Sequence, residues 1–122
     1  MVKDPKADRQ PKKLGASFYQ TASGSEPVRE WLLQMRDGDR KIIGGDIATL
    51  EFGWPIGMPL CRPMGGGLFE LSSSLAGNRI ARVVFCTTKG HLVLLHGFEK
   101  KTQKTPPSEL ALAKKRMKEI EE

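Results

Sequence analysis

Three strand-like segments separated by very short turns place the tightest constraint on how this chain can fold. The segments 68–75, 79–87 and 91–98 are rich in apolar and β-branched residues, as strands are. The pairs Gly77-Asn78 and Lys89-Gly90 separate them, and connections this short join antiparallel neighbours. The sequence therefore predicts an antiparallel meander, whose last strand is apolar on both faces and belongs in the centre of a sheet.

The first of these strands has two different faces. Alternation along a strand sends successive side chains to opposite sides of the sheet. One face is a predicted core face and the other, which includes Glu70 and Ser72, is a predicted partly solvated face. The core face holds Phe69, Leu71, Ser73 and Leu75, and the other face holds Leu68, Glu70, Ser72 and Ser74.

Apolar residues recur at helical spacing on both sides of the meander. Two helices joined by a short turn are predicted before it and one helix after it, although Gly44 and Gly45 lower the helical propensity of the second. The predicted caps and ends are Ser25, Pro27 and Gly38 for the first helix, Asp39 for the second, and Thr105 with Pro106 for the last. The apolar stripes are Val28, Trp31, Leu32 and Met35; Ile43, Ile47 and Leu50; and Leu110, Ala113, Met117 and Ile120.

The remaining segments complete a single domain. Residues 1–15 are polar and basic and predict a disordered tail, whereas residues 16–22 predict a short first strand. Residues 53–67, rich in Gly and Pro, predict a loop. The predicted class is α+β, with one domain over residues 16–122 and the element order β-α-α-β-β-β-α.

Charge and cysteine content limit the function classes. Lys and Arg number 20 against 14 Asp and Glu, and a small domain with a net charge of +6 suits a polyanionic partner, either nucleic acid or an acidic protein. No apolar run approaches the roughly 18 residues that a membrane span needs. Cys61 and Cys86 are far apart, so we expect neither a metal site nor a disulfide framework, and we expect a cytoplasmic protein.

Several long motifs resemble one known family. They are Gly67–Ser72, Arg79–Phe85 and Val93–Pro106, with weaker matches at Glu26–Leu32 and Phe52–Pro55. Together they resemble the RelE/HigB-type toxins of type II toxin–antitoxin systems, specifically the phage-derived HigB-like branch. The run Lys100–Pro106 is the longest and most specific of these motifs, and the resemblance extends over about residues 17–120.

The resemblance implies both a fold and a function. The fold is a RelE-like small twisted, mainly antiparallel sheet with two N-terminal helices and one C-terminal helix. The function is ribosome-dependent cleavage of mRNA, which inhibits translation. The implied partners are mRNA, the ribosome and a cognate antitoxin, typically a HigA-like helix-turn-helix protein. Operator DNA would be bound only through that antitoxin.

The chemistry implied by the resemblance needs no metal ion or cofactor. The ribose 2′-OH attacks the adjacent phosphorus while a base takes its proton, cations stabilise the phosphoryl charge and an acid protonates the leaving 5′-oxygen. Arg82, a charge on an otherwise apolar strand face, is the first catalytic candidate, since a guanidinium binds two phosphate oxygens. The other catalytic candidates are Lys101, Lys104 and Glu70, with Glu70 as a possible base; the RNA-binding candidates are Arg79, Lys100, Gln103 and Ser72.

One position departs from the family pattern. Where relatives usually carry Arg after Glu-Leu, this chain has Ser72. The alternative function is therefore a catalytically weakened or inactive member of the family that still binds RNA or the antitoxin. Structural roles are also open for individual residues, because Arg82 could form a salt bridge and the lysines of 100–104 could be a solvated charge run.

Overall fold

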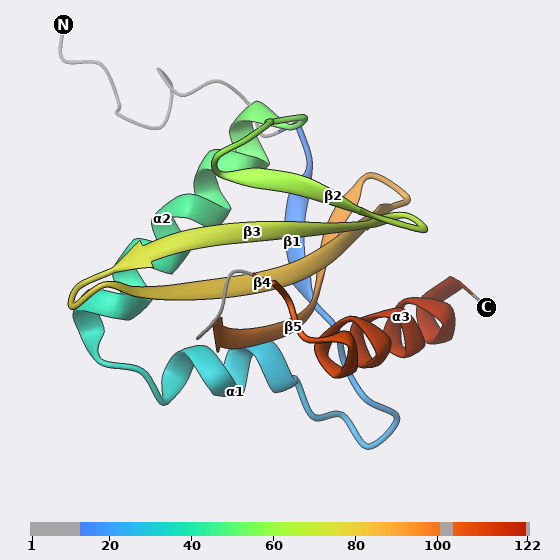
Figure 1. The fold of residues 1–122 in the computed structure, drawn as a ribbon. Coiled ribbons are helices and arrows are strands. Elements are labelled where there is room, and N and C mark those ends of the chain that lie inside the picture. Colours follow the sequence, from blue (N-terminus) through green and yellow to red (C-terminus); the bar gives the residue numbers. More distant parts are fainter. Residues whose placement is uncertain (1–12, 101–103, 122) are drawn as a thin grey trace, which may run out of the picture.

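A computed structural model describes residues 13–100 and 104–121 (Figure 1). The elements are β1 (Gly15–Phe18), α1 (Pro27–Leu33), α2 (Asp37–Gly53), β2 (Cys61–Gly65), β3 (Leu68–Leu75), β4 (Arg79–Thr88), β5 (His91–Lys100) and α3 (Pro107–Glu121). The five strands form one sheet in the order β1-β5-β4-β3-β2. Only β1 runs parallel to its neighbour, β5. The predicted α+β class, a small twisted and mainly antiparallel sheet with three helices, is confirmed.

The meander forms as predicted, and its turns explain why. Thr88 pairs with His91, so Lys89 and Gly90 are the two turn residues, and both have positive φ, at 50° and 80°. Two central residues with positive φ make the turn that matches the natural twist of a β-hairpin. The strands extend further than predicted, to Thr88 in β4 and to Lys100 in β5.

The prediction of a loop over residues 53–67 is wrong at its end, where β2 forms an edge strand. Gly65 pairs with Leu68, and Gly66 and Gly67 form a tight turn with φ of 64° and 91°. The glycine run is therefore a hairpin turn rather than a flexible loop. Pro63 argued against a strand in the sequence. Proline is nevertheless tolerated in an edge strand, where its missing N–H need not cost a hydrogen bond between strands. The element order is thus β-α-α-β-β-β-β-α.

The helix and strand boundaries also differ from the predicted ones. α1 ends at Leu33 and α2 begins at Asp37, so Asp39 lies inside the first turn of α2 and is not its cap. Ser25 does not cap α1, since its hydroxyl donates to Glu30 at 2.7 Å. α3 begins at Pro107, and the Thr105 hydroxyl donates to a strand carboxylate instead of capping it. Strand β1 is shorter than the predicted 16–22.

The predicted tail of residues 1–15 lies largely outside the described residues. Its last residues are described: the backbone N–H groups of Lys13 and Leu14 donate to the carbonyl of Glu51, and Gly15 already belongs to β1. None of the helices in residues 13–100 and 104–121 is long and apolar enough to cross a membrane.

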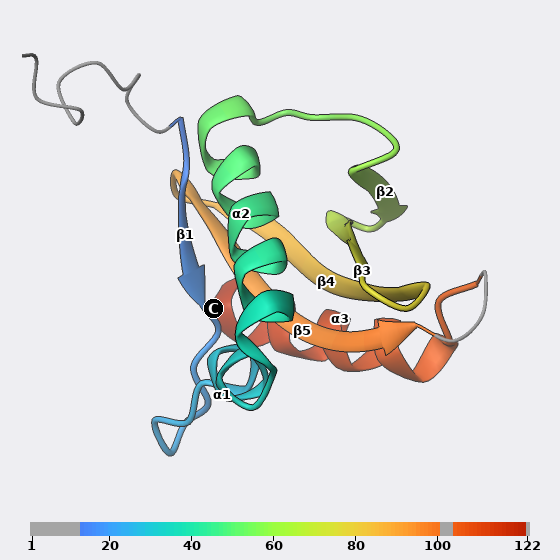
Figure 2. The same cartoon turned by 90° about the vertical axis from the view of Figure 1, so that its left-hand side faces the viewer.

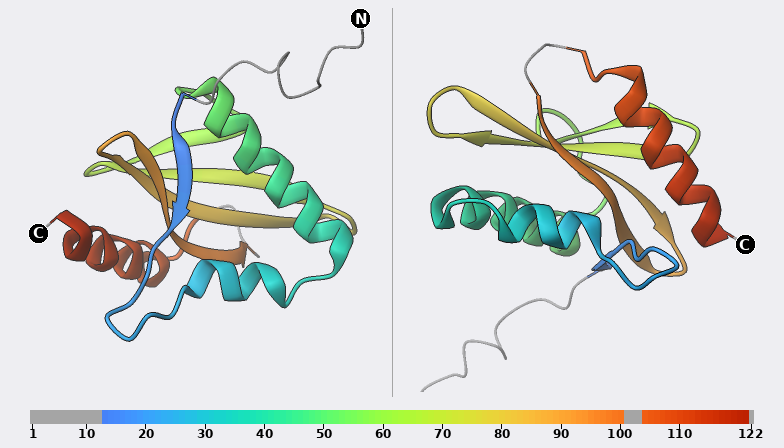
Figure 3. Two further views of the ribbon diagram at one scale, coloured as in Figure 1. Left: turned by 180° about the vertical axis from the view of Figure 1, so that it is seen from behind. Right: turned by 90° about the horizontal axis from the view of Figure 1, so that it is seen from below.

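The helices cover the two faces of the sheet unequally. α1 and α2 lie on one face and α3 lies on the other (Figures 2 and 3). The α1/α2 face holds the larger apolar core, centred on Ile43, Leu50, Leu71, Phe85 and Leu92. The α3 face holds a smaller one, to which α3 contributes the buried residues Ala113 and Met117.

Polar contacts supplement the small core under α3. Arg116 donates to the Leu95 carbonyl at 2.8 Å and lies over the Tyr19 ring, and the Tyr19 hydroxyl donates to Glu119. His96 and Glu109 are joined at 2.8 Å. The expectation that the second face of β3 is partly solvated is wrong for Leu68 and Glu70, which are buried on the same side of the sheet as α3.

Candidate functional site

Strand register gathers charged residues on the α3 side of the sheet. Arg62 pairs with Glu70 across β2 and β3, and Ser72 pairs with Arg82 across β3 and β4. Lys100, at the end of β5, pairs with Ile80, two residues before Arg82 and on the same face of β4. We call Arg62, Arg82 and Lys100, which surround Glu70, the cation cluster. It combines residues that lie far apart in the sequence.

Glu70 is the centre of the cation cluster. Its side chain is fully buried, and its Oε1 accepts from Arg82 Nη1 at 3.0 Å and lies 3.3 Å from Arg62 Nη2. Its Oε2 accepts from the Thr105 hydroxyl, just before α3. Arg82 also donates to Ser72 Oγ. The carboxylate therefore fixes two guanidinium groups that arise from different strands.

Positive charge exceeds negative charge in the cation cluster. Three cationic side chains share one carboxylate, and the exposed fractions of the Arg82 and Arg62 side chains are 12% and 35%. Lys100 Nζ, Arg82 Nε and Arg62 Nε are buried, and within the described part of the chain none of them has a hydrogen-bond acceptor. Buried excess charge is unfavourable unless a counter-ion compensates it, so this arrangement suits an anion.

Burial also alters the acid–base properties of the cation cluster. Burial, and then the nearby charge of Arg82, lowers the pKa of Lys100 below its ordinary value of 10.5. Glu70 opposes this shift, because its negative charge favours the protonated amine. Burial lowers the pKa of Arg82 as well, but a guanidinium remains charged at any physiological pH. Lys100 is therefore the member of the cluster that can exchange a proton most readily.

Arg62 is the member of the site that the sequence did not predict. It lies in the Gly- and Pro-rich segment that predicted a loop, and a loop residue has no defined face. The usable signal was the Gly65-Gly66-Gly67 run just before a predicted strand, because glycines with positive φ form hairpin turns. A hairpin at that run would have placed Arg62 opposite Glu70.

Several of the other predicted site residues lie elsewhere. Arg79 is apart from the cation cluster, because it forms ion pairs with Asp39 at 2.9 Å and Glu99 at 2.8 Å. These two hydrogen bonds, to Asp39 first, raise its pKa. Lys101 and Gln103 lie outside the described residues. Lys104 is exposed just before α3.

Both tryptophans pack against other residues of the fold. The Trp54 ring packs edge-on against Phe69 and Phe85, with centroid distances of 4.9 and 5.5 Å. Trp31 packs against Gly97 so closely that a Cβ atom built on that glycine would lie 2.4 Å from the ring. Among residues 13–100 and 104–121, no group of three or more His, Cys, Asp or Glu side chains is placed to hold a metal ion.

Removing the charge of Lys100 is expected to stabilise the free protein. We predict that Lys100→Met raises the free energy of unfolding by about 1 kcal/mol at neutral pH, because a buried cation without an acceptor is replaced by an apolar chain of similar length. Since the pKa of Lys100 is lowered on folding, the unfolded chain binds more protons below pH 10.5, and wild-type stability from this group rises with pH.

The advantage of Lys100→Met should therefore shrink as the pH approaches 10.5. Urea unfolding of both proteins from neutral to alkaline pH measures this difference. Lys115→Met, at an exposed position of α3, is the matched control and should change stability by no more than about 0.5 kcal/mol. A Lys100→Met protein that is less stable than wild type at neutral pH would mean that the charge is already compensated.

Comparison with known protein families gives one match. The family model described as "Phage derived protein Gp49-like (DUF891)" matches residues 30–118, which is most of the chain and includes all members of the cation cluster. No curated protein sequence matches the chain.

Proposed function

Because the chain belongs to the family of phage-derived Gp49-like proteins, we propose that it is the toxin of a type II toxin–antitoxin system, of RelE/HigB type. Its proposed activity is metal-free, ribosome-dependent cleavage of mRNA, which inhibits translation in the cytoplasm. The motifs of β3, β4 and the run Lys100–Pro106, which resemble those toxins, support this proposal.

The observation that carries the proposal is the excess positive charge of the cation cluster. A phosphate diester would bring the negative charge that the three cations lack. Arg62 and Arg82 approach Glu70 from β2 and β4, the two strands that flank β3. Each has an Nε–H group without an acceptor in the described residues. Guanidinium groups bind phosphate oxygens in pairs, so the two arginines suit the charge that develops on the phosphoryl group.

The cleavage step then uses groups of this chain alone. We propose that Lys100, in the molecules in which it is neutral, takes the proton from the 2′-OH as the oxygen attacks phosphorus, since its lowered pKa makes that form more accessible. Arg62 and Arg82, which share the single carboxylate of Glu70, then still provide the excess positive charge that holds the phosphate. The bond from phosphorus to the 5′-oxygen breaks, and Lys104 or Lys101 supplies a proton to that oxygen. The products are a 2′,3′-cyclic phosphate and a 5′-hydroxyl end.

This proposal changes the roles that the sequence suggested for two residues. Glu70 was a candidate base, but its two oxygens are already occupied by Arg82, Arg62 and Thr105. Glu70 is instead proposed as a positioning residue that holds the two guanidinium groups in place. Lys100 was a candidate for RNA binding and is now the proposed base.

Arg62 offers an explanation for the unusual Ser72. The RelE/HigB-type toxins that the chain resembles usually carry an arginine at the position of Ser72, which pairs with Arg82 in the register. Here the Ser72 hydroxyl accepts from Arg82, and Arg62 reaches Glu70 from the other neighbouring strand. We propose that Arg62 supplies the second guanidinium that Ser72 cannot.

The proposed partners follow from the same site. The ribosome would present mRNA to the cation cluster, and a HigA-like helix-turn-helix antitoxin would block it and carry the complex to operator DNA. Gln103 is a further proposed RNA contact, together with Ser72 at the edge of the cluster. Arg79, a candidate RNA contact from the sequence, is engaged by Asp39 and Glu99 and has no role in the proposed site.

Expression of the chain without an antitoxin tests the function. We expect growth arrest and a fall in translation, with mRNA fragments that end in a 2′,3′-cyclic phosphate. Cleavage of mRNA on purified ribosomes, with EDTA present, measures the reaction directly and should continue because no metal is needed. An Arg62→Ala/Arg82→Ala protein is the control and should leave growth and mRNA intact.

A second candidate function rests on Ser72 and on the engaged carboxylate of Glu70. In this alternative the chain is an inactive member of the family that binds RNA or its antitoxin without cutting. The same ribosome assay separates the two candidates. Soluble protein that binds RNA but leaves mRNA uncut would establish the inactive form and overturn the nuclease proposal.

A further inference from the structure

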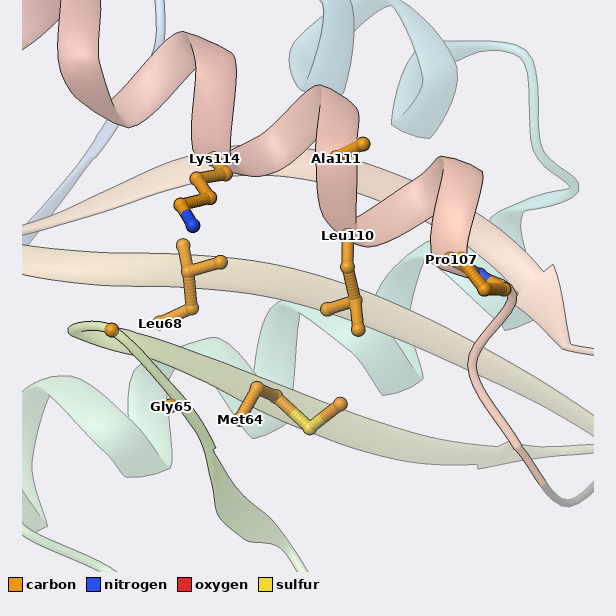
Figure 4. Close-up of a pocket in the computed structure, with 8 residues that line it drawn as sticks. Met64, Gly65, Leu68, Pro107, Leu110, Ala111 and Lys114 are labelled. Carbon is orange, nitrogen blue, oxygen red and sulfur yellow. The ribbon is translucent and has the colours of Figure 1, made fainter.

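A cavity lies beside the cation cluster and is not used by the proposed cleavage step. It has a volume of about 330 Å³ and opens between α3 and the turn that joins β2 to β3. Met64 and Leu68 form the strand wall, and Pro107, Leu110 and Lys114 form the helix wall. Figure 4 shows Leu110 and Lys114 pointing from α3 toward Leu68 and Met64.

The cavity is continuous with the cation cluster along two strands. Met64 follows Arg62 on β2, at the register shift between Pro63 and Gly65, and packs against the α3-side core, whereas Leu68 is two residues before Glu70 on the regular strand β3. Residues two apart on a strand point to the same face at a spacing of about 7 Å. A ligand held at the cation cluster would therefore reach the cavity with its next chemical group.

The walls of the cavity suit a ligand that has a flat, weakly polar group with a negatively charged group on either side of it. Met64, Leu68, Pro107 and Leu110 present apolar atoms, and a methionine thioether makes favourable contacts with aromatic rings. Lys114 adds a cation at the side of the cavity, in addition to the cluster at its strand side. A nucleotide in a single-stranded nucleic acid has this pattern, since its base is flanked by phosphates.

We propose that this cavity binds the base of the nucleotide next to the phosphate held at the cation cluster, and that Lys114 contacts the following phosphate. The inference rests on the proposed RNA-cleaving function and adds a base subsite to it. An apolar side chain of a protein partner would also fit between the walls, but it would bring no negative charge to the cation cluster or to Lys114.

Binding of a short 2′-O-methylated RNA tests the subsite, because this RNA has no 2′-OH that could attack. Fluorescence anisotropy would give Kd for the intact strand and for strands with one abasic nucleotide, placed at each position in turn. We expect one abasic position to weaken wild-type binding by about tenfold, at the lower end of what a stacked base contributes. In Leu110→Ala this ratio should fall to about twofold, because the apolar wall is lost.

Lys114→Gln tests the phosphate contact without disturbing the core, because the residue is exposed. It should weaken binding of every strand and reduce the slope of log K against log salt by about 0.7, the value for one phosphate contact on a single strand. Lys115→Gln, the neighbouring exposed lysine that does not line the cavity, is the matched control and should leave the slope unchanged.

The possible failures are distinguishable. The proposed function itself would be overturned if the wild-type protein did not bind RNA, or if Arg62→Ala bound RNA as tightly as wild type. RNA binding that depends on Arg62 but shows no abasic effect and no change of slope in Lys114→Gln would overturn the subsite alone. Leu110→Ala protein that binds RNA normally but loses the antitoxin would show that a protein side chain occupies the cavity. If Leu110→Ala fails to fold in a thermal melt, the salt slope of Lys114→Gln decides.

Discussion

Replacing Arg82 with alanine is expected to lower the rate of RNA cleavage by about 100-fold and to change the affinity for uncleaved RNA by only a few-fold. Arg82 is the more buried of the two arginines in the cation cluster, and it is fixed by Glu70 and Ser72. A rigidly held hydrogen-bond donor is most effective at stabilising a negative charge that develops at one position in the transition state. Its loss should therefore reduce kcat much more than it raises KM.

Single-turnover cleavage of mRNA on ribosomes, with RNA affinity measured separately, checks this expectation. Arg79→Ala is the matched control, because Arg79 lies on the same strand but forms its ion pairs with Asp39 and Glu99, apart from the cluster. It should retain cleavage within about threefold, as expected for a residue outside the reaction. If Arg79→Ala lost as much activity as Arg82→Ala, the assignment of the cleavage site to the cation cluster would be wrong.

Glu70→Gln is expected to destabilise the free protein by about 3 kcal/mol, or about 10 °C in Tm. Glutamine keeps the shape of the side chain and one of its two acceptor oxygens, so the loss comes from the charge and from one hydrogen-bond acceptor. Without that charge, Arg62, Arg82 and Lys100 remain together with no compensating anion in the described residues. Thermal and urea unfolding of purified protein measure the effect.

Two comparisons separate this electrostatic effect from simple loss of a hydrogen bond. Glu99→Gln removes a carboxylate that pairs with an arginine but is 40% exposed, and it should cost less than about 1 kcal/mol. Adding Lys100→Met to Glu70→Gln should recover part of the lost stability, because the two residues act through the same excess charge. Equal costs for Glu70→Gln and Glu99→Gln would contradict the central role of Glu70.

The fold was largely predictable because its signals are local. The pairs Gly77-Asn78 and Lys89-Gly90 fix the meander, because glycine and asparagine readily adopt the positive φ angles that these turns require; Lys89 adopts a positive φ that its residue type does not favour. β2 was missed because Pro63 and the glycines resemble a loop, and only pairing with β3 makes that segment a strand. The burial of Glu70 was not predictable from the alternation of β3, because the elements that cover it come from distant parts of the sequence.

The candidate site shows the same division. Glu70 and Ser72 were expected on one face of their strand, and the register of β3 and β4 brings Arg82 to them. Lys100 was expected to follow the last strand as an RNA-binding candidate, yet it ends β5 and is only 8% exposed. Its burial depends on the extra length of β5, and that length was hidden by a run of charges typical of a loop.

The unequal apolar cores on the two faces of the sheet have a consequence for how the molecule opens. Partial unfolding begins where the least apolar surface must be exposed, and α3 contributes only Ala113 and Met117 to the buried core beneath it. Its polar contacts to the sheet side, through Arg116 and Glu119, are partly buried. Detachment of α3 would widen the cavity and remove Thr105 from Glu70, while the α1/α2 side kept the sheet intact. A partner that needs wider access to the cation cluster would gain it when α3 detaches, because this opening requires less free energy than unfolding of the α1/α2 side.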